Sequence, residues 1–132
     1  MVNASRRSAS ERAEDSRQFL PLTPAVFHVL LALADEDRHG YGIILEVEER
    51  TGGEVRLRTG TLYTILARLL EDALVAETPP PQVDKDDPRR KYYALTPLGR
   101  AVVRAEAHRL ERLLALAQDK RILPAGSRGR GR

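Results

Sequence analysis

The sequence predicts a mainly helical domain of the α+β class, in which three helices precede a two-stranded hairpin and one long helix follows it. Two observations carry this prediction. Apolar residues recur at helical spacing in four segments, and two short β-like runs lie between the third and fourth of them. Hydrophobic residues make up 42% of the 132-residue chain, which is enough for one core in a single ordinary domain.

The first helix is expected to begin after Thr23, because a threonine N-cap followed by a proline is a common start signal. Its apolar residues form two stripes on different faces. One stripe is Val26, Val29, Leu30 and Leu33, and the other is Phe27, Leu31 and Ala34. A helix that is apolar on two faces needs cover on both sides, and we expect a partner subunit to supply one of them.

The second helix is predicted over residues 40–51, where Gly52 and Gly53 end it. We expect His39 to cap its first turn. The third helix is predicted over residues 60–72 with Thr59 as its N-cap. Its core side consists of Leu62, Ile65, Leu66, Leu69 and Ala73, whereas Thr61, Thr64, Arg68 and the Tyr63 hydroxyl point outward.

The hairpin is predicted from the runs 74–78 and 91–96, which flank a connection rich in proline and charge. Successive side chains of a strand point to opposite faces. Of Tyr92 and Tyr93, one is therefore expected in the core and the other on the outer face.

The last helix is predicted from Pro97 to Asp119, with Thr96 as its N-cap. Its first turns suit packing on the chain's own domain, whereas later apolar residues recur at coiled-coil-like spacing. No further segment is available to cover them, so the pattern predicts a homodimer. The predicted dimer face comprises Phe27, Leu31, Val103, Ala107, Leu110, Leu113, Leu114 and Ala117, with Leu116 widening it.

The net charge of +3 is distributed unevenly along the chain. Residues 119–132 carry five basic residues and one acidic residue, so the tail supplies the excess. Residues 35–55 hold seven acidic residues, whereas residues 56–68 and 88–105 hold three and five basic residues and no acidic one. Such basic stretches are typical of a phosphate-binding surface or of ordinary solvated surface.

The composition excludes several classes of site. The chain has no cysteine, which excludes disulfide scaffolds, cysteine zinc sites and thiol catalysis. No apolar run approaches the roughly 18 residues of a membrane span, and the N-terminal residues lack the apolar stretch of a signal peptide. We therefore expect a cytoplasmic protein. His108 and Glu111 are interpreted as a surface pair, and the adjacent carboxylates give no support for acid–base catalysis, so we expect no enzyme activity, metal or cofactor.

Three motifs extend over much of the part of the chain that is expected to be ordered: HGYGI at 39–43, TGTLYTILARLLEDALV at 59–75 and RRKYYALTPLG at 89–99. In combination they resemble the PadR-like family of winged-helix transcriptional regulators. The single helix after the wing resembles the small subgroup of that family. The sequence departs from the family pattern at Thr64, where proline is usual, and at Gly42, where an acidic residue is more common.

The resemblance implies a winged helix-turn-helix with a two-stranded wing and a long C-terminal dimerisation helix. It also implies a dimeric repressor that binds a palindromic operator on double-stranded DNA. Such a repressor is expected in the bacterial cytoplasm, where it is associated with the nucleoid when it is bound to DNA. Release from DNA by a small-molecule effector or by another signal is typical of such proteins, and in some relatives the effector lies between the C-terminal helices and the first helix. The chain then divides into a disordered arm (1–18), a DNA-binding domain (19–96), a dimerisation helix (97–124) and a disordered basic tail (125–132).

DNA contacts are expected from the outer face of the third helix and from the wing, because a helix fits the major groove and a basic wing reaches the backbone. The residues concerned are Arg56, Arg58, Thr59, Thr61, Tyr63, Thr64, Arg68, Arg89, Arg90 and Lys91. Two alternatives remain: a winged-helix protein–protein interaction module that has lost DNA binding, and a small-molecule-binding or enzymatic helical dimer. A basic, acid-free outer face favours DNA, whereas a roomy cavity between subunits would favour the last alternative.

Overall fold

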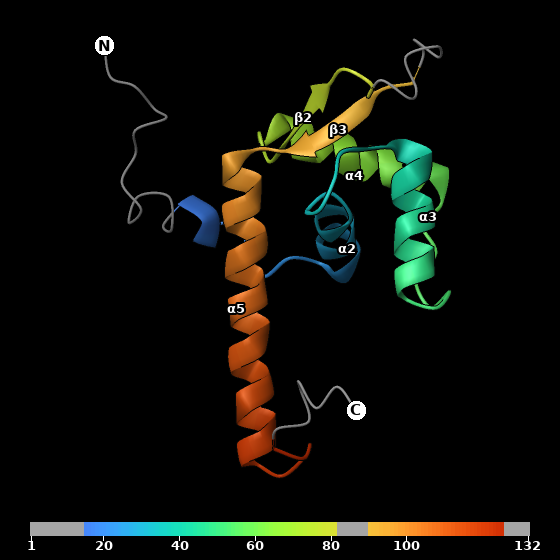
Figure 1. Ribbon diagram of the computed structural model, residues 1–132. Coiled ribbons are helices and arrows are strands. Elements are labelled where there is room, and N and C mark those ends of the chain that lie inside the picture. The colour runs from blue at the N-terminus through green and yellow to red at the C-terminus, as the bar shows by residue number, and fades with distance from the viewer. Residues whose placement is uncertain (1–14, 82–89, 126–132) are drawn as a thin grey trace, which may run out of the picture.

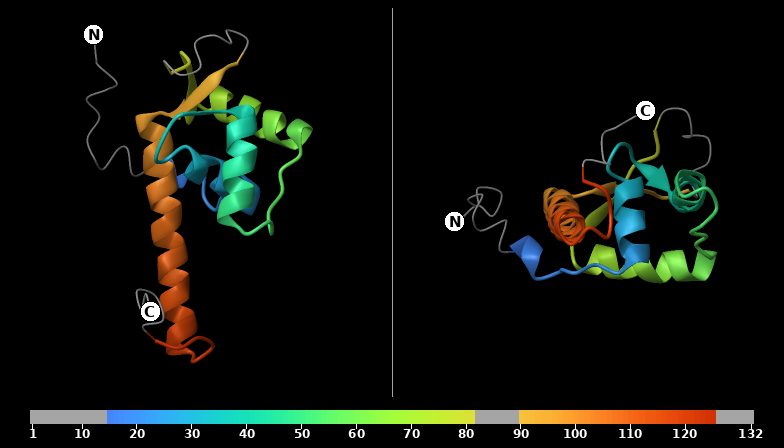
Figure 2. Two further views of the ribbon diagram at one scale, coloured as in Figure 1. Left: turned by 45° about the vertical axis from the view of Figure 1, so that its right-hand side comes forward. Right: turned by 90° about the horizontal axis from the view of Figure 1, so that it is seen from below.

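The computed structural model describes residues 15–81 and 90–125 of the chain. Its helices and strands follow in the order α2 (Pro24–Ala32), β1 (Arg38–His39), α3 (Gly40–Arg50), α4 (Thr59–Glu71), β2 (Val75–Thr78), β3 (Tyr92–Leu95) and α5 (Pro97–Asp119). Helix α2 lies between α3 and α5 and contacts both, and α4 crosses behind it beneath the sheet (Figure 1). Helix α5 continues well beyond the other elements (Figure 2).

The sheet has three antiparallel strands in the order β1-β3-β2. Strands β2 and β3 form the expected hairpin, from Val75 opposite Leu95 to Thr78 opposite Tyr92. The prediction of a two-stranded sheet missed β1, which pairs with the other edge of β3. A strand of two residues is too short to produce an alternating pattern in the sequence, so only the fold identifies it.

Three predicted helix starts are confirmed by side-chain caps. The Oγ1 atoms of Thr23 and Thr96 accept hydrogen bonds from Val26 N at 3.2 Å and from Gly99 N at 2.9 Å. His39 caps α3 through Nδ1, which accepts from Gly42 N at 3.1 Å. The prediction for α4 was wrong, because Thr59 is already helical and Arg58 is the capping residue, with no side-chain hydrogen bond.

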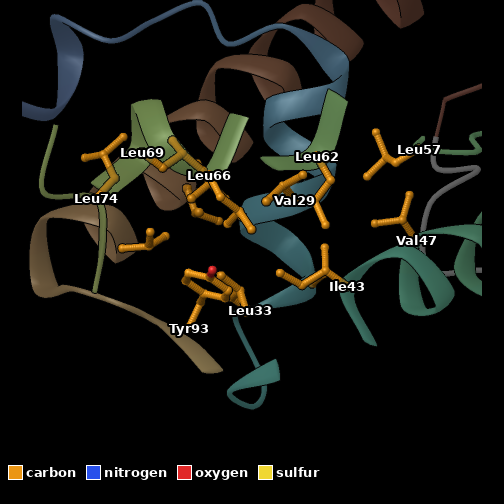
Figure 3. Close-up of a cluster of buried hydrophobic side chains, with 14 of the residues drawn as sticks. Val29, Leu33, Ile43, Val47, Leu57, Leu62, Leu66, Leu69, Leu74 and Tyr93 are labelled. Atoms are coloured by element: carbon orange, nitrogen blue, oxygen red, sulfur yellow. The ribbon is translucent and has the colours of Figure 1, made fainter. Parts of the chain in front are cut away.

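The core gathers side chains from the helices and the sheet around α4, as Figure 3 shows. Leu62, Leu66 and Leu69 of α4 meet Leu33, the C-cap residue of α2, and Tyr93 of β3 in one cluster. Burying an aliphatic side chain of this size contributes about 1.5–3 kcal/mol. Because these leucines share one face of α4, the opposite face is left to solvent.

Two expectations about burial were wrong. Ala73 is exposed, because α4 ends two residues earlier and Ala73 takes a left-handed φ of 61° in the following turn. Tyr92 and Tyr93 are both buried, at 7% and 4% exposure, because β3 is the central strand and is covered on both faces. The ring of His39 covers Tyr92 edge-on, at 5.2 Å between ring centroids.

The first described residues, 15–22, pack on the rest of the domain. Residues 15–17, which the polar composition assigned to the disordered arm, are helical, and Ser16 is buried. Glu106 of α5 is only 2% exposed, and its two carboxylate oxygens accept from Arg109 at 2.7 and 2.8 Å. Hydrogen bonds from Arg109 and from the backbone of Leu22 hold the pKa of Glu106 below its ordinary value, although burial opposes this.

Arg38 neutralises much of the acidic stretch between residues 35 and 55. Its Nε donates to the carbonyl of Ala32 at 2.7 Å, and its guanidinium lies within 4.0 Å of Asp35, Glu36 and Glu46. The guanidinium is largely buried, so the pairs are screened less than surface pairs. Arg38 thereby connects β1 to the last residue of α2 and to the interior of α3.

Candidate nucleic-acid interface

The outer face of α4 is polar. Thr59, Thr61 and Thr64 are exposed, and the Tyr63 side chain is 45% exposed on the same helix. No acidic residue lies in the first turn of α4, so its N-terminal end keeps the partial positive charge of a helix start. This face presents hydroxyl groups, with cationic side chains at both ends of the helix.

Most of these cationic side chains have carboxylate neighbours that the sequence pattern did not reveal. Arg56 lies 4.0 Å from Glu48, Arg68 3.6 Å from Asp72 and Lys91 3.8 Å from Glu77. The basic stretches are therefore free of acid along the sequence but not in space. All three cationic side chains are at least 66% exposed, and exposed pairs of this kind contribute about 0–1 kcal/mol. They can be exchanged for a phosphate at little cost.

Arg58 differs from these side chains. Within residues 15–81 and 90–125, no carboxylate lies within 4.0 Å of its guanidinium. It stands at the N-terminal end of α4, next to the exposed threonines. Its position makes it the cation of α4 that requires the least rearrangement to meet an anion.

The wing lies at the same end of the molecule as α4, far from the free end of α5 (Figure 1). Arg90 and Lys91 immediately precede β3 and are exposed. The Nη1 atom of Arg90 is 3.1 Å from Nε2 of His39. Arg89, which was predicted beside them, lies outside the described residues.

A polar hollow of about 470 Å³ lies where the start of α3, the helix α4 and the start of β3 meet. It is lined by His39, Gly40, Tyr41, Tyr63, Arg90, Lys91 and Tyr93. The hollow thus brings together Tyr63, Arg90 and Lys91 among the predicted DNA contacts, and it does not include the arginines of α4. Burial raises the pKa of Tyr93, and the neighbouring Tyr63 and Glu77 add to this.

Sequence reasoning missed His39, Gly40 and Tyr41 as parts of this site, although the HGYG motif contains them. A Cβ atom at Gly40 would meet the ring and hydroxyl of Tyr63, so a larger residue there would require the exposed Tyr63 side chain to move. The absence of a side chain at Gly40 lets α4 place Tyr63 directly on α3. The sequence did contain one signal for this part of the site, which is the glycine at position 40 of the HGYG motif.

The predicted dimer face is partly exposed. On α5, Leu110 and Leu113 are 39% and 49% exposed, and on α2, Leu31 is 41% exposed. Leu114, Ala117 and Phe27 are half-buried, and Ala107 is exposed. Val103 was wrongly assigned to this face, because it is 9% exposed and belongs to the chain's own core. The surface also includes Leu116, Ile122 and Leu123, the last two of which were not predicted.

The described residues contain no group of three or more His, Cys, Asp or Glu side chains placed to hold a metal ion. His108 and Glu111 form an exposed pair 3.5 Å apart, as interpreted from their spacing. Among the helices in residues 15–81 and 90–125, none is long and apolar enough to cross a bilayer.

Two curated proteins are similar in sequence. A 37.1 kDa protein of transposon TN4556 from Streptomyces fradiae is 42% identical over 85 residues, which are 64% of this chain and 22% of that protein. A protein X from Lysinibacillus sphaericus is 37% identical over 73 residues, which are 55% of this chain and 65% of that protein. The chain spans less than two thirds of the length of either relative.

Solved structures share the fold. A PadR family transcription regulator from Clostridium difficile R20291 is 26% identical, with a TM-score of 0.59 over 70% of this chain and 95% of that one. RosR from H. salinarum is 33% identical, with a TM-score of 0.51 over 79% of this chain and 97% of that one. The model of the transcriptional regulator PadR-like family matches residues 29–105, more than half of the chain. The chain therefore belongs to the PadR-like family of transcriptional regulators, which are not enzymes.

Proposed function

We propose that this protein is a sequence-specific DNA-binding regulator that inserts α4 into the major groove and places the wing on the adjacent backbone. The observation that carries the proposal is the exposed face of α4, where hydroxyl and cationic side chains lie at the same end of the molecule as Arg90 and Lys91. Side chains of this kind read base edges and bind phosphate. The whole apolar side of α4 is used in the core, so this face is the one left for a ligand.

Individual roles follow from position. Thr61 and Thr64 occupy the first half of α4, where recognition helices meet base edges. Arg58, at the start of the helix, is placed for a phosphate or a guanine, and Arg56 and Arg68 for the flanking backbone. Their exposed ion pairs with Glu48 and Asp72 are weak enough to be replaced by phosphate contacts.

The proposal includes a homodimer. The exposed leucines of α5 form an apolar surface that extends over the distal half of the helix, and a second copy of the same surface is its simplest complement. A dimer with two-fold symmetry presents two α4 helices in opposite orientations. It therefore favours a palindromic operator with half-sites about one helical turn apart.

Repression, and release by a small molecule, complete the proposal. A dimer that covers an operator prevents other proteins from binding the same DNA, so its expected effect is repression. The proposed location of the protein is the cytoplasm. A hollow of about 380 Å³ lies between α2 and α3, and the exposed Leu31 lines it together with His28 and Arg50. A ligand bound beside α2 would change how a partner subunit packs on that helix.

Selection of bound duplexes from a random pool tests the proposal. We expect enrichment of a palindrome, and a Thr61→Ala, Thr64→Ala variant should enrich a different or weaker sequence. Arg121→Gln, at the far end of α5, serves as the control and should enrich the wild-type sequence. A folded protein that enriches no sequence would overturn the proposal in favour of a protein–protein interaction module. Mass spectrometry of the purified protein tests for a bound effector.

A further inference from the structure

Arg38 of β1 lies outside the candidate nucleic-acid interface, but it holds the strand that attaches the wing to the helices. We infer that Arg38 is a positioning residue for DNA binding, whose guanidinium fixes the wing relative to α4 through β1 without contacting the duplex. This inference rests on the proposed function and extends it to a largely buried side chain that packs on α2 and α3.

The hairpin of β2 and β3 is attached to the helices at both ends. At its base, the Thr96 hydroxyl donates to the carbonyl of Ala73 at 2.6 Å, beside the start of α5. At its other end, β1 pairs with the first two residues of β3, which directly follow Arg90 and Lys91. The position of β1 therefore sets the position of the half of the hairpin that carries the two cations.

Strand β1 needs a further anchor, because it has only two residues and so short a pairing is marginal by itself. Its two side chains point to opposite faces of the sheet. His39 caps α3, whereas Arg38 reaches the end of α2 and the interior of α3. The Nε atom of Arg38 donates to the carbonyl of Ala32 at 2.7 Å, and its Nη2 atom lies 3.4 Å from Oε1 of Glu46. One guanidinium thereby joins β1 to both helices.

A guanidinium suits this position better than another cation. Its donors lie in a rigid planar fork, whereas a lysine ammonium is a point charge on a flexible stem. The fork also meets Asp35 and Glu36, at 3.3 and 3.6 Å, in the segment that leads into β1. The Arg38 side chain is only 16% exposed, so solvent screens these contacts little. Because three segments hold the fork, they fix both the position and the direction of β1.

Arg50 provides a matched control for the charge of Arg38. It shares Glu46 with Arg38, through a hydrogen bond of 2.9 Å from its Nε atom. Its side chain is 73% exposed, and it is the last residue of α3, at the opposite end of that helix from β1. Arg50→Met therefore removes the same charge beside the same carboxylate and leaves the anchor of β1 in place.

Duplex titrations at several salt concentrations test the role of the fork. Arg38→Met should weaken binding about 10-fold and lower the slope of log K against log salt by about two per subunit, because the two cations of the wing lose their position. Arg38→Lys keeps the charge but not the fork, and should still weaken binding by about 3-fold or more. Arg50→Met should stay within about 2-fold of the wild type. Wild-type binding by Arg38→Lys, or equal losses in Arg38→Met and Arg50→Met, would show that only charge matters and would overturn the inference.

A double-mutant cycle shows whether Arg38 acts through the wing. In a protein that already carries Arg90→Ala and Lys91→Ala, Arg38→Met should cost less than about 2-fold in duplex affinity, because the contribution of the wing is already lost. The same loss of about 10-fold in both backgrounds would mean that Arg38 acts on another part of the interface, and would overturn the inference.

Amide hydrogen exchange of the DNA-free protein tests the physical cause. In Arg38→Met and Arg38→Lys, exchange should become about 10-fold faster in β1 and at the start of β3, and should stay unchanged at Leu62 and Leu66 of α4. Equal acceleration in α4 and β3 would indicate general destabilisation and would overturn the inference. A folded wild type that binds no duplex would overturn the proposed function. A wild type that binds duplex, with unchanged exchange at β3 in both Arg38 variants, would overturn this inference alone.

Discussion

The α4 and wing end of the molecule and the distal half of α5 are both exposed, but they expose opposite chemistry. The first presents threonines, tyrosines and cations, whereas the second presents leucines that are 39–57% exposed. Both are helix faces left over when the core is complete. An exposed polar, cationic surface favours binding of a polyanion, and an exposed apolar surface favours contact with another apolar surface. One small fold therefore carries two kinds of candidate interface.

The two regions are connected through the start of α5. The Thr96 hydroxyl donates to the carbonyl of Ala73 at 2.6 Å and lies 3.1 Å from that of Leu74. Gly99 packs so closely on Leu74 that a Cβ atom would collide with its carbonyl group. The end of the α4–β2 turn thereby fixes the direction of α5, and with it the distance between the two interfaces.

The largest effect is expected from charging the apolar region. Leu110→Glu with Leu114→Glu should yield monomers in sedimentation velocity, because a buried carboxylate without a partner is costly. Duplex affinity should fall about 100-fold or more, since the second half-site no longer benefits from linkage.

Leu45→Glu is the matched control, because Leu45 of α3 is a similarly exposed leucine outside the predicted dimer face. It should remain dimeric. A dimer that persists in the Leu110, Leu114 variant would place the interface elsewhere and remove the contrast between the two regions.

The connection between the regions is tested by two glycines. Gly99→Ala should lower the free energy of unfolding by about 1–3 kcal/mol, because the added methyl overpacks a rigid backbone contact. Gly60→Ala on α4, where a Cβ atom meets nothing within 4 Å, should raise it by up to about 1 kcal/mol. Urea titrations at one protein concentration measure both, and equal changes in the two variants would contradict the close contact at Gly99.

The polar region is tested by removing the cations of the wing. Arg90→Ala with Lys91→Ala should weaken binding about 10-fold on all duplexes alike, and lower the salt slope by about two per subunit. The enriched sequence should stay the same, because phosphate contacts carry no sequence information. An unchanged slope would exclude the wing from the interface and leave α4 as its only part.

The smallest effect is expected at Glu106, between the two regions. Its pKa is lowered in the folded state by Arg109 and Leu22, so its stabilisation is present above the ordinary pKa of glutamate, about 4.3. It is lost as the pH falls through the lower, folded-state value. Glu106→Gln should cost about 1 kcal/mol at pH 7. Below pH 4 the difference from wild type should shrink, and urea titrations that show a constant difference would contradict the role of the charge.

Most helix boundaries and all but one of the caps followed from local sequence signals. Thr23, Thr96 and the proline after each carry their own start signal, because an N-cap depends on the next few residues only. The prediction that Thr59 caps α4 was wrong, because a threonine near a helix start gives the same local signal whether it is the capping residue or already part of the helix. At the candidate site, Tyr63, Arg90 and Lys91 were predicted from their motifs. His39 and Tyr41 were recognised as part of the site only from the structure, in which the start of α3 lies beside the wing.

By itself, the sequence determined the order of the helices and the hairpin, the leucine face of α4 and the family, because periodicity and motifs are properties of neighbouring residues. Tertiary structure alone decided what covers each face. It placed Val103 in the core and buried both tyrosines of β3. It also brought Glu48, Asp72 and Glu77 close to cationic side chains from stretches of the sequence that contain no acidic residue. Burial and charge pairing depend on residues far apart along the chain, and the packing of helices and strands sets those distances.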